Sequence, residues 1–326
     1  MNGMRIALLG ATSQIAMDLV RSMAAEGRHE LLLYARDPRR VEDWLRQAGL
    51  AGRYPALPYD QYGQLDHEAV INFVGVGDPS RAAEMGGDIF DITLEYDQMA
   101  LRGLRAHPRR RYIFLSSGAA YGSNFLEPAD EHTRSAISIN ALTPQEYYSV
   151  AKLHAECRHR ALPQHAIVDL RVFNLFSRTQ DLAARFFITD IVRAIQSDTE
   201  LTTAPGHMVR DFQHPADFHR LVECVLAAPP QNAVLDCYSR APIEKADLLR
   251  AMQDHFGLRY SVAAAAATPV SVNATGAKPH YYSRNHKAAA FGYQPAYAAL
   301  DTVLTETAAI LGRPRPGPEY STGDKQ

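Results

Sequence analysis

Two kinds of segment alternate along the first half of the chain. Short continuous apolar runs predict buried strands, and longer stretches in which apolar residues recur every three or four positions predict amphipathic helices. The predicted strands are Arg5–Leu9, Leu31–Ala35, a weak strand before Asp60, Ala69–Val76, Tyr112–Leu115 and Ile167–Phe173. The predicted helices are Gln14–Glu26, Pro38–Gln47, Pro79–Ala106 and Glu146–Ala161. Because apolar strands joined by helical crossovers form parallel sheets covered on both faces, the expected fold class is α/β, a doubly wound parallel sheet of the Rossmann type.

The pattern loses this regularity in the second half, where the strands are short and Pro and Gly recur. We expect residues 1–173 and 212–240 to form the Rossmann domain, and residues 174–211 and 241–312 to form a smaller, irregular substrate lobe. The alanine-rich stretch Val262–Thr268 predicts a linker or a surface helix, and the Pro-rich polar segment 313–326 predicts a flexible tail.

Composition excludes several classes of protein. With 46% hydrophobic residues and a net charge of −2, the chain has enough apolar material for a core and lacks the basic excess of a nucleic-acid or membrane-surface protein. The three cysteines are far apart and the 13 histidines show no ligand spacing, so neither a disulfide framework nor a metal site is expected. No apolar run reaches the roughly 18 residues of a membrane span, and the start lacks a signal-peptide core. The chain is therefore expected to be a soluble cytoplasmic protein.

The first predicted strand leads into the segment GATSQIA, which resembles a phosphate-binding loop. Glycines at such a turn let backbone N–H groups approach a pyrophosphate at the positive end of the following helix. Only Gly10 remains of a G-x-x-G-x-x-G pattern, although Ser13 and Ala16 are also small. By itself this signal is weak, because small residues are common at strand–helix turns. The expected cofactor contacts of this loop are Gly10, Thr12, Ser13, Gln14 and Ile15.

The end of the second strand indicates which dinucleotide would bind. Sites for NAD usually place Asp or Glu there to bind the ribose 2′-hydroxyl, whereas this chain has Tyr34-Ala35-Arg36, with Arg39 and Arg40 close behind. Arg36 would suit a 2′-phosphate, so NADP is favoured over NAD; a solvated basic helix start is the alternative. At the end of the fourth strand, Phe73, Val74 and Gly75 are expected to line the nicotinamide side of the cleft.

Three residues form a candidate catalytic group. Tyr148 and Lys152 are one helical turn apart, and Ser117 follows the strand YIFL directly. A lysine ammonium beside a phenol is expected to lower the pKa of Tyr148, which would then exchange a proton with a substrate hydroxyl. Ser117, at the carboxyl end of a strand where ligands bind in such folds, would hydrogen-bond the reacting oxygen.

Five motifs in order resemble those of the extended short-chain dehydrogenases/reductases of the NAD-dependent epimerase/dehydratase family, which act on nucleotide-sugars. They are GATSQIA, SSGAAYG, YYSVAK, LRVFN and VRDFQHPAD. The resemblance implies that Asn174 contacts the substrate pyrophosphate and that Arg210 binds the nucleotide diphosphate. It also implies a homodimer formed through two helices of each subunit, the long helix before Arg109 and the helix that carries Tyr148.

The chain departs from this family pattern at several positions. The family's 4,6-dehydratases carry Asp-Glu where this chain has Gly118 and Ala119, so dehydration is disfavoured. Ala119 also replaces the cysteine of 3,5-epimerase/reductases, and Thr93 stands at the place of a usual Asn. Arg284 stands where the family has an acid that contacts the nucleotide ribose.

Hydride transfer at a carbinol carbon is the chemistry that remains. A 4-keto-sugar reductase would use exchangeable NADPH, and a 4-epimerase would keep NAD bound; both agree with Ser117, Tyr148 and Lys152, and another oxidoreductase reaction on a nucleotide-sugar is a further possibility. Arg36 favours the reductase. A non-catalytic NADP-binding regulator is the third class, against which the intact catalytic group argues.

Overall fold

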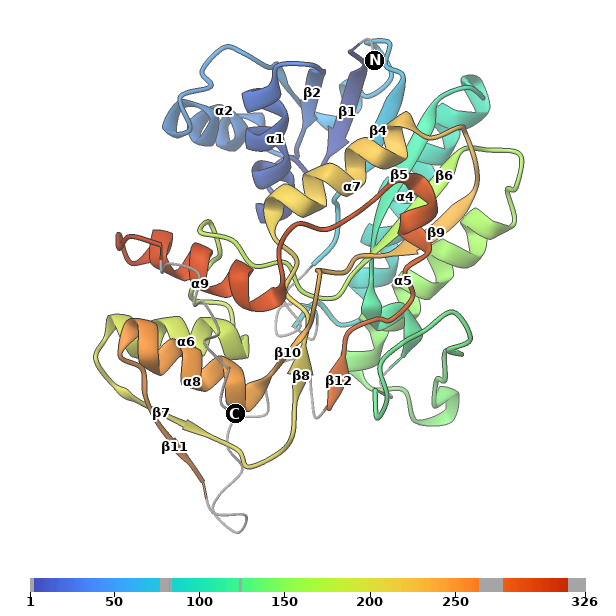
Figure 1. Ribbon diagram of the computed structural model, residues 1–326. Helices are drawn as coiled ribbons and strands as arrows, with labels where there is room; N and C mark the ends of the chain where they lie inside the picture. The colour runs from blue at the N-terminus through green and yellow to red at the C-terminus, as the bar shows by residue number, and fades with distance from the viewer. Residues whose placement is uncertain (1–2, 77–81, 83, 123–124, 264–277, 316–326) are drawn as a thin grey trace.

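The computed structural model describes residues 3–76, 82, 84–122, 125–263 and 278–315. Its centre is a seven-stranded parallel sheet in the order β3-β2-β1-β4-β5-β6-β9 (Figure 1). The strands are β1 (Arg5–Leu9), β2 (Glu30–Tyr34), β3 (Ala56–Leu57), β4 (Ala69–Asn72), β5 (Arg111–Ser117), β6 (Ile167–Val172) and β9 (Ala233–Asp236). This order and the parallel pairing confirm the expected Rossmann-type fold class.

Helices cover both faces of the sheet. On one face lie α1 (Gln14–Glu26), α2 (Pro38–Gln47) and α7 (Pro215–Ala227), and on the other lie α4 (Asp88–Ala106) and α5 (Pro144–Arg160). Along β1, Ile6 and Leu8 belong to the core of the first face, while Ala7 and Leu9 belong to the core of the second. Since side chains alternate between the faces of a strand, a strand covered on both sides must be apolar throughout.

Most predicted elements are present, with different ends. The helix predicted at Glu146–Ala161 begins at Pro144, because proline suits the first helical position and Thr143 and Glu146 form a capping box there. The strand predicted at Ala69–Val76 ends at Asn72, whose side chain accepts a hydrogen bond from the Val74 N–H (2.9 Å). The first part of the helix predicted at Pro79–Ala106 lies largely outside the described residues; α4 begins at Asp88.

The remaining elements gather beyond the carboxyl ends of the sheet strands (Figure 1). They are α6 (Phe187–Gln196), β7 (Glu200–Thr203), β8 (Val209–Arg210), β10 (Ile243–Glu244), α8 (Lys245–Phe256), β11 (Arg259–Val262), β12 (His280–Tyr281) and α9 (Ala299–Ile310). β8 lies between β10 and β12 in a small sheet. Helices α6, α8 and α9 enclose a hydrophobic core that is separate from the two cores on the faces of the central sheet. The described residues also include the short 3-10 helices η1 (Tyr59–Gln61), η2 (Gly118–Tyr121), η3 (Ile139–Ala141) and η4 (Lys287–Phe291).

The predicted division into two domains stays a prediction. Ala288 and Tyr293, which belong to the predicted substrate lobe, pack in the core between the central sheet and helices α1, α2 and α7. Val262 ends β11, whereas the rest of the predicted alanine-rich segment, beyond residue 263, and the tail beyond residue 315 lie outside the described residues.

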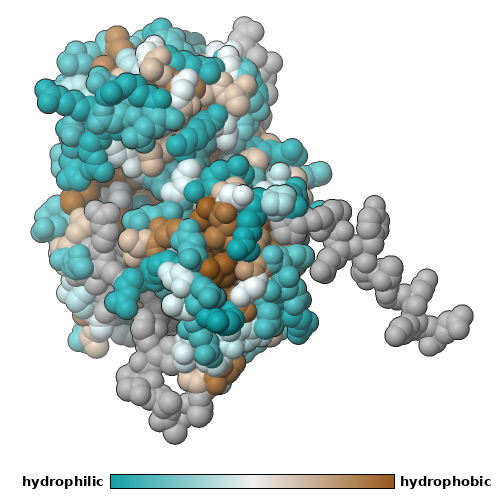
Figure 2. All heavy atoms as spheres, turned by 90° about the vertical axis from the view of Figure 1, so that its left-hand side faces the viewer, coloured by the Kyte–Doolittle hydropathy of each residue, from teal (hydrophilic) through white to brown (hydrophobic). Residues whose placement is uncertain are grey.

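Figure 2 shows an apolar patch in the middle of a face that is otherwise largely hydrophilic. Within the described ranges, no helix combines the length and the apolar character of a membrane span.

Candidate active site

The structure brings Ser117, Tyr148 and Lys152 together at the carboxyl end of β5. Ser117 is the last residue of β5 and caps η2, because its Oγ accepts a hydrogen bond from the Ala119 N–H (3.1 Å). Helix α5 packs against η2, and its Tyr148 hydrogen-bonds with Ser117. Lys152 follows one turn later, with Nζ 5.7 Å from the centre of the Tyr148 ring. A partly buried phenol thus meets a buried hydroxyl and a buried amine, as the motifs predict.

The protonation of Tyr148 differs from the expectation. Burial raises the pKa of Tyr148 above its ordinary value, and the hydrogen bond with Ser117 offsets only part of this rise. The expected lowering by Lys152 is absent in this structure, because the amine is directed elsewhere: Nζ donates to the Leu115 carbonyl (2.8 Å). Without a bound ligand, Tyr148 is therefore a neutral phenol at physiological pH.

Lys152 connects the catalytic group to the predicted cofactor side of the cleft. Its ammonium lies 4.5 Å from the centre of the Phe114 ring, and burial lowers the pKa of Lys152 to about 8. A Cβ atom placed on Gly75 would come within 3.2 Å of Lys152 Nζ. Gly75, predicted from its place after the fourth strand, is thus next to Lys152.

The turn after β1 has the shape expected of a dinucleotide loop. Gly10 has φ +80°, and a Cβ atom there would come within 2.9 Å of the Val74 nitrogen and 3.0 Å of the Phe73 carbonyl carbon. Only glycine allows this close approach. The Gly10 N–H also donates to the hydroxyl of Tyr59 (3.0 Å), a residue that no sequence signal marked. Gly10, Phe73 and Val74, predicted from separate segments, therefore lie against one another.

Helix α1 begins directly after this loop, with Ser13 as its N-cap. The Ser13 side chain makes no capping hydrogen bond. The backbone N–H groups of the first turn are therefore not capped by Ser13. Thr12, Ser13 and Ile15 are partly exposed at this end. The amide of Gln14 is engaged, because its Nε2 donates to Ser177 Oγ (2.8 Å) and to Asp18 (3.2 Å). A phosphate would bind to the backbone of this turn.

No acid stands at the end of β2. Tyr34 and Ala35 are buried, and Arg36 is exposed, as are Arg39 and Arg40 on α2. Within the described part of the chain these three arginines form no ion pair with a carboxylate. Their positive charge is thus available to a ligand, as the preference for NADP requires.

Asn174 and Arg210 lie on neighbouring segments, as their shared predicted role requires. Asn174 Nδ2 donates to the carbonyl of Asp211 (3.0 Å). Arg210 is buried, and its Nη1 donates to the carbonyls of Val209 (2.8 Å) and Lys278 (2.7 Å). Burial lowers the pKa of Arg210 to about 10, and no carboxylate of the described residues pairs with it. A buried unpaired guanidinium favours an anionic ligand.

Lys278 is a second cation at this place, and no sequence motif pointed to it. Burial and the neighbouring charge of Arg210 lower the pKa of Lys278 to about 8. Its Nζ lies 4.8 Å from the centre of the Tyr281 ring and 5.2 Å from that of Phe125. Two desolvated cations side by side would be stabilised by a ligand with two negative charges, such as a diphosphate.

Aromatic side chains lie between these cations and Ser117. Tyr281 is paired with Arg210 in the register of β12 and β8, and its hydroxyl lies 3.4 Å from Ser117 Oγ. The ring of Tyr281 packs against Phe125 and Phe173. A Cβ atom on Gly118 would come within 2.5 Å of the Phe173 ring, so the aspartate of the dehydratases has no room at this position. Arg284, at the place of the usual acid, is exposed.

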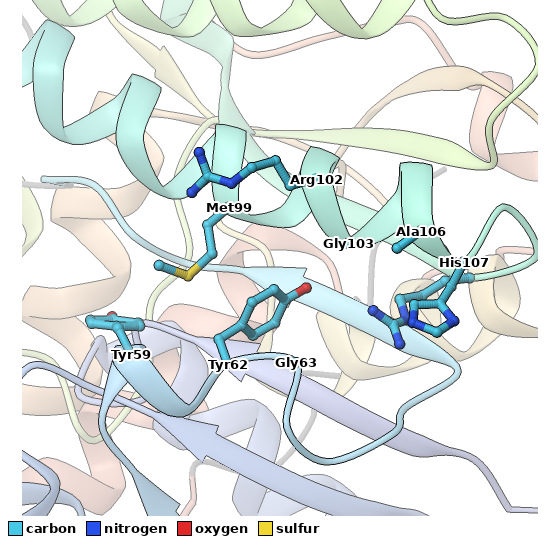
Figure 3. A pocket seen from close by; sticks show the side chains of 9 residues that line it. Tyr59, Tyr62, Gly63, Met99, Arg102, Gly103, Ala106 and His107 are labelled. Carbon is cyan, nitrogen blue, oxygen red and sulfur yellow. The ribbon is translucent and has the colours of Figure 1, made fainter.

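A separate cavity of about 310 Å³ lies between η1 and the second half of α4 (Figure 3). Tyr59, Tyr62 and Met99 form its apolar side, and Arg102 and His107 are on its polar side. None of the predicted site residues lines it. The cavity is thus distinct from the group around Ser117, although Tyr59 connects its wall to Gly10.

Comparison with known proteins gives one family. A model described as "NAD dependent epimerase/dehydratase family" matches residues 6–238. A search of curated proteins gives no match.

Solved structures of similar fold include three nucleotide-sugar epimerases. UDP-N-acetylglucosamine 4-epimerase from Methanobrevibacter ruminantium M1 has a TM-score of 0.76 at 14% identity, over 96% of this chain and 99% of its own. UDP-glucuronic acid 4-epimerase from Bacillus cereus, solved with UDP-glucuronic acid and NAD, has a TM-score of 0.75 at 15% identity, over 95% and 99%. UDP-glucose 4-epimerase from Thermotoga maritima has a TM-score of 0.73 at 14% identity, over 95% and 99%. At such identities the likeness is one of fold.

Proposed function

This chain belongs to the NAD-dependent epimerase/dehydratase family, and we propose that it transfers hydride at C4 of a nucleotide-sugar, with Tyr148 as acid/base. The family match agrees with the resemblance of the motifs and with the expectation of a nicotinamide cofactor. The observation that carries the proposal is the convergence of Ser117, Tyr148 and Lys152 at the carboxyl end of β5.

The described residues fit such a cofactor. Gly10, which packs closely against Val74, adds no side chain to the turn in front of the α1 N-terminus, where a pyrophosphate would be held by backbone N–H groups. Gly75 and Lys152 lie together at the place assigned to the nicotinamide side. When bound, the nicotinamide supplies or accepts the hydride.

Tyr148 moves the proton that accompanies the hydride. Because burial raises the pKa of its phenol, Tyr148 in the free protein is prepared to donate a proton to a carbonyl oxygen as that carbon is reduced. Ser117, hydrogen-bonded to Tyr148, would hold the same oxygen. In the reverse direction the phenolate accepts the proton of the hydroxyl, and the ammonium of Lys152 stabilises that phenolate.

Reduction of a 4-keto-sugar with NADPH is the version that Arg36 favours. A reductase exchanges its cofactor in every turnover, and NADPH is recognised through its 2′-phosphate. Arg36, Arg39 and Arg40 are exposed near the end of β2 and have no carboxylate partner among the described residues. Arg210, Asn174 and Lys278 would hold the diphosphate of the substrate.

Epimerisation at C4 with tightly held NAD is the second candidate. It is favoured by the fold shared with three 4-epimerases and by the absence of a dehydratase acid at Gly118.

A homodimer is also proposed, with α4 and α5, which pack against each other, as its interface helices. Light scattering of the purified protein tests the dimer independently of activity.

The experiment combines cofactor identification with a substrate test. The nucleotide released by denaturing the purified protein is identified by mass, and the protein is then incubated with UDP-, GDP-, CDP- and dTDP-sugars. Reductase action predicts an empty site and oxidation of NADPH by a 4-keto-sugar; epimerase action predicts bound NAD and interconversion without added cofactor. Failure of every sugar to react would contradict both versions.

A matched pair of variants tests the catalytic group. Tyr148→Phe should lose activity by about 10²- to 10⁴-fold and still bind the cofactor. Tyr147→Phe is the control, because Tyr147 is adjacent on α5 and packs against Phe90. If the chain were a non-catalytic regulator, Tyr148→Phe would leave its partner effect unchanged, and the proposal would be wrong.

A further inference from the structure

Outside the candidate active site, three side chains meet between the end of α1 and the middle of α7. Glu26 is the last residue of α1, and His219 and Glu223 are one turn apart on α7. One donor atom from each of these side chains lies within 4.8 Å of the other two. The sequence showed no metal-ligand spacing because the third side chain comes from a helix almost 200 residues away, and spacing is informative only within one segment.

The distances between these side chains agree with the coordination of one metal ion. His219 Nε2 lies 3.5 Å from Glu223 Oε1 and 3.9 Å from Glu26 Oε2. Tetrahedral coordination with bonds of about 2.1 Å places two ligand atoms about 3.4 Å apart. The two distances from His219 are close to this value, and the two carboxylates lie within 4.8 Å of each other.

The imidazole of His219 is buried and has an unsatisfied nitrogen. His219 is 8% exposed, and its Nε2 makes no hydrogen bond. Glu223 Oε1, in contrast, lies 3.1 Å from His29 Nε2. Native structures leave few buried polar atoms unpartnered, and such atoms point to a ligand. Glu26 approaches this nitrogen of His219, with Oε2 at 3.9 Å.

His29 positions Glu223 and is not itself a ligand. The Met4 N–H donates to His29 Nδ1 (3.0 Å), so that nitrogen carries no proton and the neutral ring has its proton on Nε2. Nε2 then donates to the Glu223 carboxylate, at 3.2 Å from Oε2 and 3.1 Å from Oε1. Hydrogen bonds of this kind orient the carboxylates that bind metals.

We propose that Glu26, His219 and Glu223 bind one divalent transition-metal ion such as Zn²⁺, with a water molecule as the fourth ligand. One imidazole and two carboxylates suit zinc, whereas magnesium prefers oxygen ligands alone. Arg28, which pairs with both carboxylates, is the cation that the ion must outcompete. The ion would crosslink α1, which follows the glycine loop, to α7, which follows the segment of Arg210.

Metal binding to the full chain tests this site without reference to catalysis. After chelation and dialysis, titration calorimetry should show one Zn²⁺ per chain, and Zn²⁺ but not Mg²⁺ should raise the melting temperature. Absence of saturable Zn²⁺ binding would overturn the proposal.

Variants assign the binding to these residues. His219→Ala and Glu26→Gln should each weaken Zn²⁺ binding at least tenfold. Because Glu26 is 41% exposed, Glu26→Gln should fold normally even if the buried substitution His219→Ala prevents folding. His132→Ala is the matched control, because His132 and Glu131 form an exposed pair at 3.4 Å. Equal Zn²⁺ affinity in Glu26→Gln and in the unmodified chain would assign the binding elsewhere and contradict the proposal.

Discussion

The hydroxyl of Tyr281 lies 3.4 Å from Oγ of Ser117, although the two residues are 164 positions apart in the chain. Ser117 Oγ already accepts the Ala119 N–H, so its own proton is directed to a neighbouring oxygen, and Tyr148 and Tyr281 are the two phenols beside it. Tyr281 thereby influences how Ser117 is oriented toward a substrate oxygen.

Tyr281→Phe removes this hydroxyl and keeps the packing of the ring against Phe125 and Phe173. We expect kcat/KM to fall about fivefold, the effect of losing a neutral hydrogen bond of about 1 kcal/mol. The matched control is Tyr282→Phe, whose neighbouring ring is only partly buried. Steady-state kinetics decides the matter: equal losses in the two variants would mean that the contact with Ser117 has no role.

Lys278→Met tests the second cation beside Arg210. The affinity for a nucleoside diphosphate should fall about tenfold or more, since a charge-assisted hydrogen bond contributes about 1.5–3 kcal/mol. UDP, GDP, CDP and dTDP serve as calorimetric probes, and Lys287→Met, at an exposed lysine of the same segment, is the control.

The pH dependence of this binding gives a second measurement. Burial lowers the pKa of Lys278 to about 8, so the amine is charged below that pH and loses its charge above it. The affinity of the unmodified chain for the diphosphate should therefore decline as the pH rises from 7 to 9, while that of Lys278→Met should stay level. A parallel decline in both proteins would place the titrating group elsewhere.

Arg36→Ser tests the choice of cofactor. If Arg36 binds the 2′-phosphate, NADPH should bind about tenfold or more weakly in the variant, and NADH should bind as before. Fluorescence titration of the reduced cofactors measures both affinities, with Arg105→Ser, at another exposed arginine, as the control. A similar loss for NADH and NADPH would show that Arg36 does not distinguish them.

Local pattern predicted those parts of the molecule that depend on neighbours in sequence. The ranges of β1, α1 and α2 follow from apolar periodicity and from signals such as Asp37, which caps α2. Ser117 could be placed because parallel strands end at a common edge of the sheet, where ligands bind. Tyr148 could be placed because it lies on the helix that follows the Ser117 segment and starts at the same edge.

Residues that depend on distant pairing could not be placed in this way. Lys278 and Tyr281 reach the site because β12, a strand of two residues, pairs with β8, and so short a strand has no periodicity to detect. The pKa of Tyr148 was expected to fall because Lys152 is one turn away, but it depends on burial and on the direction of the amine, which spacing does not reveal.

His159 lies at the centre of a buried charge cluster between α5, α4 and β6. Its Nδ1 is 2.6 Å from Asp169 Oδ1 and its Nε2 is 2.7 Å from Asp97 Oδ1, with all three side chains fully buried. Burial alone would lower the pKa of His159, but the charges and hydrogen bonds of Asp169 and Asp97 outweigh it and raise the pKa to about 9. The ring is thus an imidazolium at neutral pH that neutralises buried carboxylates.

His159→Gln leaves those carboxylates without this cation, and we expect the free energy of unfolding to fall by about 3–5 kcal/mol near pH 6. Because the folded-state pKa of His159 is above the unfolded value of about 6.5, its stabilisation is complete below pH 6.5 and is lost as the pH rises through about 9. Urea denaturation at pH 6 and pH 9.5 should therefore show a smaller difference between variant and unmodified chain at the higher pH. Arg46→Gln, which breaks the exposed pair with Asp43, should change stability by less than about 1 kcal/mol at either pH. A difference for His159→Gln that does not narrow at pH 9.5 would mean that the imidazolium charge is not what stabilises the cluster.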